Sequence, residues 1–224
     1  MDSIFFKHGE LDAVSPFENL NMENKSILIR FAKVFEQTYT RFLDLQKAEV
    51  QAREAQIEAA LERVRSRTMA MQHSDELIEV VISIFNALKQ LDYNPHDCTI
   101  FTFDLNEKAM NCWSSIPAEN GFSTFQYVIP IIDHPFIDQI ISSFKKKQNI
   151  LNYHLAGEEK ESYDDLFFQS VNFPEMEVAL RAIKELNSSF IFMSRGAIAT
   201  FTEISLSEKD FKLLERFSKV VDLS

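Results

Sequence analysis

The first long segment of the chain carries a helical pattern of hydrophobic and polar positions. No glycine or proline occurs between Pro16 and Pro95, so nothing in that interval forces the backbone out of a helix. Residues 46–72 are rich in Ala, Glu, Arg, Gln and Leu, which lose little freedom in a helix. We therefore predict a helix over residues 21–73, roughly 75 Å long at about 1.5 Å per residue. A helix of that length needs a partner helix.

Two apolar seams follow one another along this helix at steps of three and four residues. The second runs from Ile57 to Met71 and has heptad spacing. The first runs from Leu45 to Ala59, is rich in alanine and is offset in phase, which is typical of a stutter. We predict a parallel homodimer, and the alternative is a single solvated helix held by charge pairs. The predicted dimer seam consists of Leu45, Ala52, Ile57, Leu61, Val64, Thr68 and Met71.

The two ends of the chain resemble each other. Residues 4–15 are typical of a short hairpin that turns near Gly9. Residues 191–221 match residues 4–35 with a single-residue gap, so that Ile4 corresponds to Ile191 and Gly9 to Gly196. We interpret residues 1–20 as the closing hairpin of a preceding, truncated unit. Two strands alone are marginal in water, so we expect this hairpin to dock on another sheet edge or on a partner chain.

Between the two hairpins lies a complete unit over residues 74–205, followed by an exit helix over residues 206–224. A helix with acidic residues in its first turn opens the unit, and three strands follow within residues 98–131. Helices are predicted over 135–147, 158–171 and 174–186, with a strand at 149–154 and a hairpin at 190–202. This order predicts an α+β fold, an antiparallel sheet with flanking helices.

The long helix carries a resemblance to a known family. The run from Phe31 to Leu77, FAKVFEQTYTRFLDLQKAEVQAREAQIEAALERVRSRTMAMQHSDEL, is similar to the linkers between GAF-like sensor domains of multidomain bacterial signalling proteins, whose outputs include histidine kinases and cyclases. The resemblance implies a GAF-like domain that passes a signal along a dimeric coiled coil. The bilin-binding members carry a Cys-His pair, whereas here Thr99 follows Cys98 and Trp113 follows Cys112. The resemblance therefore implies no particular ligand.

Composition excludes several classes of protein function. The formal charge of −11 argues against general affinity for nucleic acid. No apolar run reaches the ~20 residues of a membrane helix, and the first residues do not resemble a signal peptide. Two cysteines suit a reduced, cytoplasmic protein. Four glycines in the whole chain leave no Gly-rich phosphate loop, and we expect neither a metal nor a cofactor.

Function is open between two classes, a sensory module and a structural dimerisation spacer without a ligand. A third alternative makes His73 the phosphoacceptor of a histidine kinase, but the proline that usually follows a few positions later is missing before Pro95. We expect no catalytic activity in this chain. A small-molecule ligand, if bound, would lie between the sheet and the segment over residues 133–186, while the same aromatic residues could simply fill the core. The candidate ligand-binding residues are Trp113, Tyr127, His134 and Tyr153.

Overall fold

A computed structural model describes residues 2–14, 20–93, 97–118, 121–172 and 174–222, and the chain divides into two compact units. The first unit is Met1–Ile57 and the second is Glu58–Ser224. One helix, α1 (Met22–Ala70), contributes to both. It confirms the predicted long helix, which begins one residue later and ends three residues earlier than expected. The unit boundary falls inside it, so residues 58–70 belong to the second unit.

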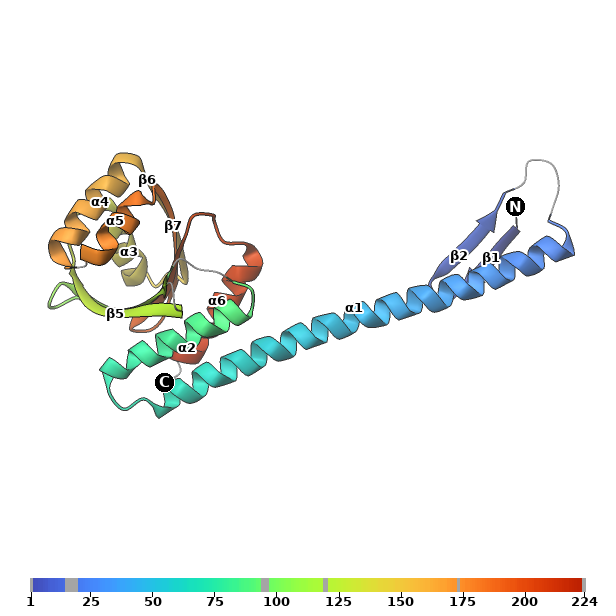
Figure 1. Cartoon of the computed structure of the whole chain (residues 1–224), viewed down its shortest axis with the longest axis horizontal. Helices are drawn as coiled ribbons and strands as arrows, with labels where there is room; N and C mark the ends of the chain where they lie inside the picture. Colours follow the sequence, from blue (N-terminus) through green and yellow to red (C-terminus); the bar gives the residue numbers. More distant parts are fainter. Residues whose placement is uncertain (1, 15–19, 94–96, 119–120, 173, 223–224) are drawn as a thin grey trace. The chain divides into compact units, whose positions relative to one another are not determined.

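The first unit combines a hairpin with the start of α1 (Figure 1). Strands β1 (Asp2–Phe6) and β2 (Gly9–Ala13) pair antiparallel. The ring of Phe6 meets that of Phe35 edge-on at 5.4 Å, and Lys25 forms an ion pair with Asp2 at 2.8 Å. The hairpin thus packs on its own helix, which corrects the expectation of a foreign sheet edge or a partner chain. Aromatic side chains of α1 already offer it an apolar surface.

The second unit is built on an antiparallel sheet. Within the described residues the strand order is β5-β4-β3-β8-β7-β6. The strands are β3 (Asp97–Asp104), β4 (Ala109–Ala118), β5 (Gly121–Pro130), β6 (Ile150–Ala156), β7 (Glu185–Phe192) and β8 (Gly196–Thr202). Together with the helices this confirms the α+β class.

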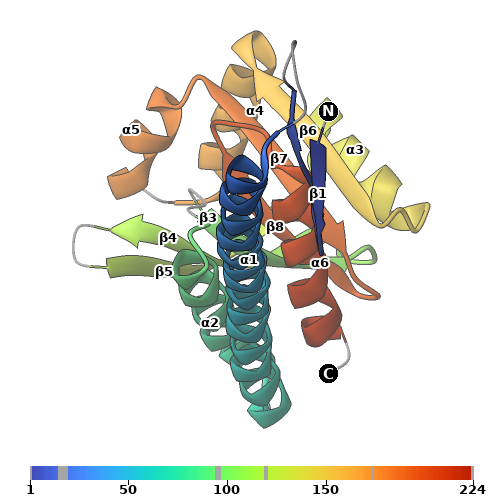
Figure 2. The ribbon, with the colours of Figure 1, turned by 90° about the vertical axis from the view of Figure 1, so that its right-hand side faces the viewer.

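Helices cover both faces of the sheet (Figures 1 and 2). On one face lie α2 (Leu77–Gln90), which a short 3-10 turn η1 (Ser74–Glu76) precedes, and α6 (Glu208–Asp222). On the other lie α3 (Pro135–Lys145), α4 (Gly157–Ser170) and α5 (Pro174–Ala182). The helix predicted to Leu186 ends at Ala182, because that stretch enters β7 and pairs with β6.

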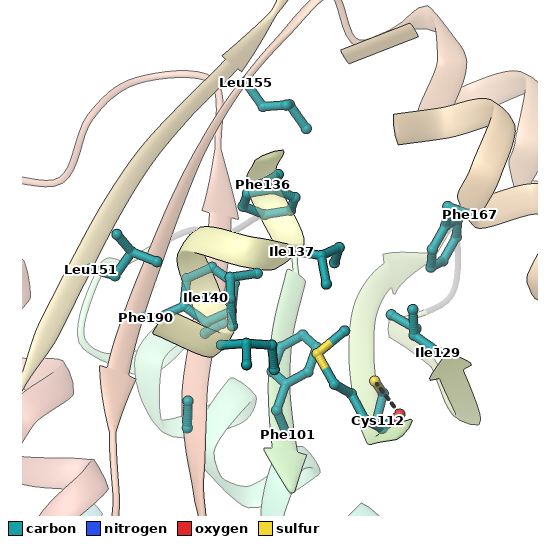
Figure 3. Close-up of a cluster of buried hydrophobic side chains, with 14 of the residues drawn as sticks. Phe101, Cys112, Ile129, Phe136, Ile137, Ile140, Leu151, Leu155, Phe167 and Phe190 are labelled. Carbon is teal, nitrogen blue, oxygen red and sulfur yellow. Dashed lines mark hydrogen bonds between the residues drawn. The ribbon is translucent and has the colours of Figure 1, made fainter. Parts of the chain in front are cut away.

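The main core lies between the sheet and α3. Phe136 and Ile140 of α3 are fully buried against Phe190 of β7 and Phe101 of β3 (Figure 3). The rings of Phe101 and Phe190 lie 5.6 Å apart, which is a favourable separation for aromatic pairs. The alternation of β-strand side chains sends these residues to one face and their neighbours to the face under α2 and α6.

The internal repeat has a structural counterpart. In the first hairpin Phe5 pairs with Glu10, and in the second the corresponding Phe192 pairs with Ala197. Each hairpin precedes a helix with a side-chain cap. Asn24 N donates to Asn21 Oδ1 at 2.8 Å, and Asp210 N donates to Ser207 Oγ at 3.2 Å. The sequence match therefore reflects the same hairpin register and the same type of helix start.

Candidate functional site

A cavity of about 270 Å³ lies in the second unit between the sheet and helices α4 and α5. Strands β3, β4, β5, β7 and β8 supply its floor, and the two helices supply its cover. Its walls are largely apolar. Seven aromatic side chains contribute to them, namely Phe101, Phe125, Tyr127, Tyr163, Phe167, Phe168 and Phe201. A concave apolar site with a few polar groups is what small-molecule ligands generally occupy.

The aromatic wall is ordered by contacts between rings. Tyr127 of β5 meets Phe167 of α4 edge-on at 6.0 Å, and Tyr163 stacks on Phe167 at 5.8 Å. Burial raises the pKa of both tyrosines, so both phenols are neutral at physiological pH. Figure 3 shows Phe167 and Ile129 where this wall meets the main core. The wall is therefore continuous with the packed core, although side chains such as Tyr127 and Tyr163 are only partly buried.

A chain of polar side chains crosses the floor of the cavity. The phenol of Tyr127 lies 2.9 Å from Ser114 Oγ, which lies 2.6 Å from Thr99 Oγ1. Thr99 in turn donates to Asp97 Oδ2 at 3.3 Å. Burial raises the pKa of the Asp97 carboxyl well above its usual range, although the bonds from Thr99 and from the backbone of Phe201 act in the opposite direction. Its other oxygen, Oδ1, is buried and has no hydrogen-bond partner among the described residues.

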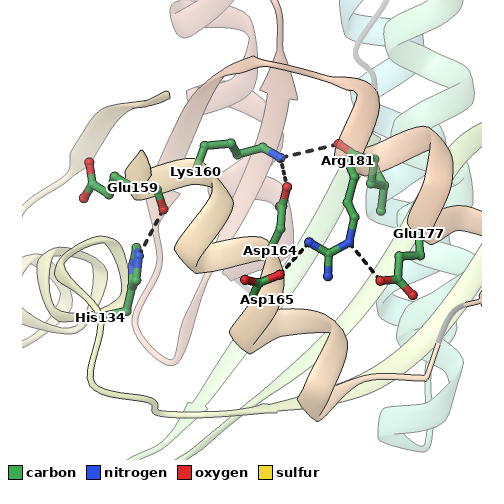
Figure 4. A network of polar contacts seen from close by, with 8 residues as sticks. His134, Glu159, Lys160, Asp164, Asp165, Glu177 and Arg181 are labelled. Carbon is green, nitrogen blue, oxygen red and sulfur yellow. Dashed lines mark hydrogen bonds and ion pairs between the residues drawn. The ribbon is translucent and has the colours of Figure 1, made fainter. Parts of the chain in front are cut away.

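A buried ion pair lies in the cover. Lys160 and Asp164 of α4 face each other at 2.5 Å, with side chains that are 5% and 9% exposed. Lys160 also donates to the backbone oxygen of Leu180, at 3.4 Å, and so ties α4 to α5 (Figure 4). Burial raises the pKa of Asp164, and the bond from Lys160 lowers it in part. The pair neutralises itself inside an otherwise apolar wall.

A second polar link joins the two cover helices. Arg181 of α5 bonds to Glu177 in its own helix at 2.8 Å and to Asp165 of α4 at 2.7 Å (Figure 4). Its guanidinium also lies over the ring of Phe168, 5.1 Å from the centroid. Because these groups are partly exposed, each contact stabilises the cover only modestly. They position α5 over the cavity.

Of the four candidate ligand-binding residues, Tyr127 lines the cavity and Trp113 does not. Trp113 precedes Ser114 on β4, so its side chain points to the opposite face, where α2 packs. There it is 4% exposed. Trp113 is therefore removed from the candidate site. The sequence showed an aromatic residue in a strand but not which face it occupied.

The remaining two candidates meet at Glu159 rather than in the cavity. His134 Nε2 lies 3.2 Å from the backbone oxygen of Glu159, and Tyr153 donates to the Glu159 carboxylate. His134 Nδ1 also accepts from Phe136 N and so caps α3. Burial and the hydrogen bond to Glu159 raise the pKa of Tyr153 to about 12. Both side chains have structural partners here, and they do not line the cavity.

The predicted dimer seam needs a correction in its second half. Leu61, Val64 and Thr68 are buried within the single chain, in the part of α1 that contacts α2 and α6 through side chains. Arg67 pairs there with Glu79 of α2, and Arg216 of α6 pairs with Glu58 at 2.7 Å. Heptad spacing predicted a buried face correctly but not that the chain itself covers it. These three residues have no surface left for a second chain in this arrangement.

The rest of the predicted seam has a different environment. Leu45 and Ala52 are exposed, while Ile57 and Met71 are partly buried. His73 is exposed and precedes η1 without a side-chain cap bond. Among the described residues, no His, Cys, Asp and Glu side chains gather as they would around a metal, and none of the helices is long and apolar enough to span a bilayer.

Asp97 is the site residue that the sequence analysis missed. It stands at the start of a strand, where an acidic residue usually belongs to a turn. Only the pairing of β3 with β4 and β8 places it on the cavity face. The sequence of this chain matches no family model and no curated protein, so this site must be judged from its own geometry.

Proposed function

We propose that this chain is a non-catalytic sensory and signal-relay region of a cytoplasmic bacterial signal-transduction protein. In this proposal the second unit is a GAF-like domain and α1 belongs to a dimeric coiled coil. The observation that carries the proposal is the placement of the cavity. It opens on the sheet face under α4 and α5, while the opposite face packs on α2 and α6, next to residues 58–70 of α1.

The first unit supplies a surface for the proposed dimer. Its hairpin contacts one stripe of α1, where Ala32 is buried and the rings of Phe35 and Tyr39 meet hairpin rings while staying 54% and 38% exposed. A second stripe stays exposed: it follows steps of four, three and four residues through positions 27, 31, 34 and 38, and then steps of seven residues to positions 45 and 52. Its large members are Ile27, Phe31, Val34 and Leu45, which are between 44% and 65% exposed.

This exposed stripe extends the predicted seam toward the N-terminus. Heptad spacing over several turns is the pattern that a second identical helix fills by knobs-into-holes packing. In a parallel dimer each residue of the stripe meets its own copy, so the apolar positions face apolar positions and Thr38 faces Thr38. We therefore assign the parallel homodimer to the stripe from Ile27 to Ala52, in place of Leu61 to Met71.

In this proposal the sheet connects the cavity with the helices that pack against residues 58–70 of α1. β3 and β4 contribute to the cavity floor on one face and contact α2 on the other. A ligand shifts the helices only if it binds one of their arrangements better than another. Coupling free energies of about 1–3 kcal/mol are typical of such linkage. Differential burial of the aromatic wall would be sufficient to supply that amount.

Hydrogen exchange with a neutral probe tests the proposal. We expect 1-naphthylmethanol, an aromatic alcohol, to slow amide exchange in α4 and α5 of the full chain and to change exchange in α6 and in residues 58–70 of α1. A matched variant, Ile129→Trp, fills the cavity wall and should abolish both effects. Protection of α4 and α5 without any change in α6 would support ligand binding but contradict the relay. No protection at all would favour the structural spacer.

A further inference from the structure

The carboxyl group of Asp97 is the unexplained polar group of the cavity. Its Oδ2 accepts from Thr99, but its buried Oδ1 has no partner among the described residues. A buried acceptor without a partner costs about 1–3 kcal/mol, and such groups in native structures require an explanation. Since Asp97 lines the cavity, a donor on a bound molecule would satisfy that oxygen.

The hydroxyl chain determines which chemistry fits beside Asp97. Thr99 uses its hydrogen for Asp97, so its oxygen accepts from Ser114 at 2.6 Å. Ser114 then accepts from the phenol of Tyr127 at 2.9 Å. In this order every hydroxyl donor points toward the carboxylate, and successive bonds strengthen one another. When Asp97 is ionised, this order directs the hydroxyl hydrogens toward the carboxylate and leaves none for a ligand, so the ligand has to donate.

The charge balance of the cavity points the same way. The ionisable side chains that line it are Asp97, Lys160, Asp164, Tyr127 and Tyr163. Lys160 and Asp164 form an ion pair at 2.5 Å and cancel, and the two phenols are neutral. Burial favours the neutral carboxyl in the empty cavity, and no side chain that lines the cavity would compensate Asp97 once it is ionised, so a cation beside it would stabilise the ionised form. Aromatic faces, which surround it, also attract cations.

We propose that the cavity takes a hydrophobic amine, whose ammonium group binds Asp97 Oδ1 while its apolar part lies against the aromatic wall. This inference rests on the proposed function, because it names the ligand class for the same cavity. The ammonium group supplies donors to Asp97 Oδ1, which among the described residues that line the cavity is the buried oxygen without a partner, and it balances the charge of the ionised carboxylate. An alcohol of the same shape would supply a donor but no charge, and a carboxylic acid would add a second negative charge.

Calorimetric titration with an isosteric pair tests the proposal on the full chain. The probes are 1-naphthylmethylamine and 1-naphthylmethanol, which differ only in the ammonium and hydroxyl groups. We expect the amine to bind about tenfold or more tightly than the alcohol, as a charge-assisted hydrogen bond predicts. Asp97→Asn should remove the advantage of the amine and leave the affinity for the alcohol within about threefold. The control Glu161→Gln, at an exposed position of α4, should change neither affinity.

The outcomes separate this inference from the proposed function. Equal affinities, or a preference for the alcohol, would overturn the amine assignment while leaving a ligand-binding cavity. An amine advantage that survives in Asp97→Asn would overturn the role of Asp97. Failure of both probes to bind the unmodified chain would contradict the amine assignment and the ligand-binding cavity together. Circular dichroism of Asp97→Asn controls for folding, which we expect to be intact because a neutral amide replaces a buried acid.

Discussion

Leu61 and Leu45 test how α1 is divided between its own domain and a second chain. Both belong to the apolar seams predicted from the sequence, but Leu61 is 4% exposed and Leu45 is 55% exposed. Truncation of a buried leucine to alanine costs about 2–5 kcal/mol. Since Leu61 lies on a helix at the edge of the second unit, we expect Leu61→Ala to cost about 2–4 kcal/mol. For a chain of this length about 1 kcal/mol corresponds to about 2–4 °C in Tm, so Tm should fall by roughly 5–15 °C.

Leu45→Ala is the matched control for this prediction. It removes the same atoms from a position that is 55% exposed and lies in the first unit, so the free energy of unfolding of the second unit should change by less than about 0.5 kcal/mol. Its effect should appear only in the association of the first unit, as a dependence of mass on concentration. Thermal melts at several concentrations, combined with sedimentation, separate the two. Equal and concentration-dependent effects of both substitutions would refute the assignment of Leu61 to the intramolecular core.

Three further substitutions test individual contacts. Asp97→Asn should become more stable relative to the unmodified chain as pH rises above about 4. The pKa of the buried carboxyl is raised in the folded state, so folding favours the protonated form and ionisation at higher pH opposes folding. If this is wrong, urea melts between pH 4 and 8 will show a constant difference in the free energy of unfolding. Lys160→Met should cost about 3–5 kcal/mol by leaving a buried carboxylate unpaired, and adding Asp164→Leu should restore most of it in the same melts. Gly196→Ala should unfold the second unit, because a Cβ there would lie 1.9 Å from a backbone oxygen of β3. The control is Gly9→Ala at the repeat-related position, where the nearest atom to a Cβ would be a side-chain atom 3.5 Å away. Equal Tm values for the two alanine variants would contradict this prediction.

Local patterns along the chain were sufficient to predict most of its elements. Helix formers without glycine or proline predicted α1, and alternation with turn residues predicted the strands. The internal match between Gly9 and Gly196 predicted two hairpins, and both have the same register. Element type follows from neighbours in sequence, which is why these predictions needed no knowledge of the tertiary structure.

The contents of the site depended on pairings that lie far apart in sequence. Trp113 was assigned to a ligand because it is a large aromatic residue, but the register of β4 turns it under α2. Asp97 was overlooked because its role arises only when β3 lies beside β4 and β8. Likewise, the spacing of Leu61 and Val64 indicated a buried face without indicating what buries it. Periodicity predicts that a face is covered, and only the fold shows by what.

Disulfide cross-linking in the first unit tests the central claim most directly. Leu45→Cys and Ala52→Cys, in separate variants, lie one heptad apart on the exposed stripe, and a parallel dimer brings each within bonding distance of its own copy. The native Cys98 and Cys112 are buried, and burial raises the pKa of both thiols, so they should not compete. We predict a cross-linked dimer at both positions. We also predict that 1-naphthylmethylamine changes the oxidation rate at residue 52, and that it leaves this rate unchanged in a variant that also carries Asp97→Asn. Absence of cross-linking at either position, or a rate that is unaffected by a probe that calorimetry shows to be bound, would contradict the account.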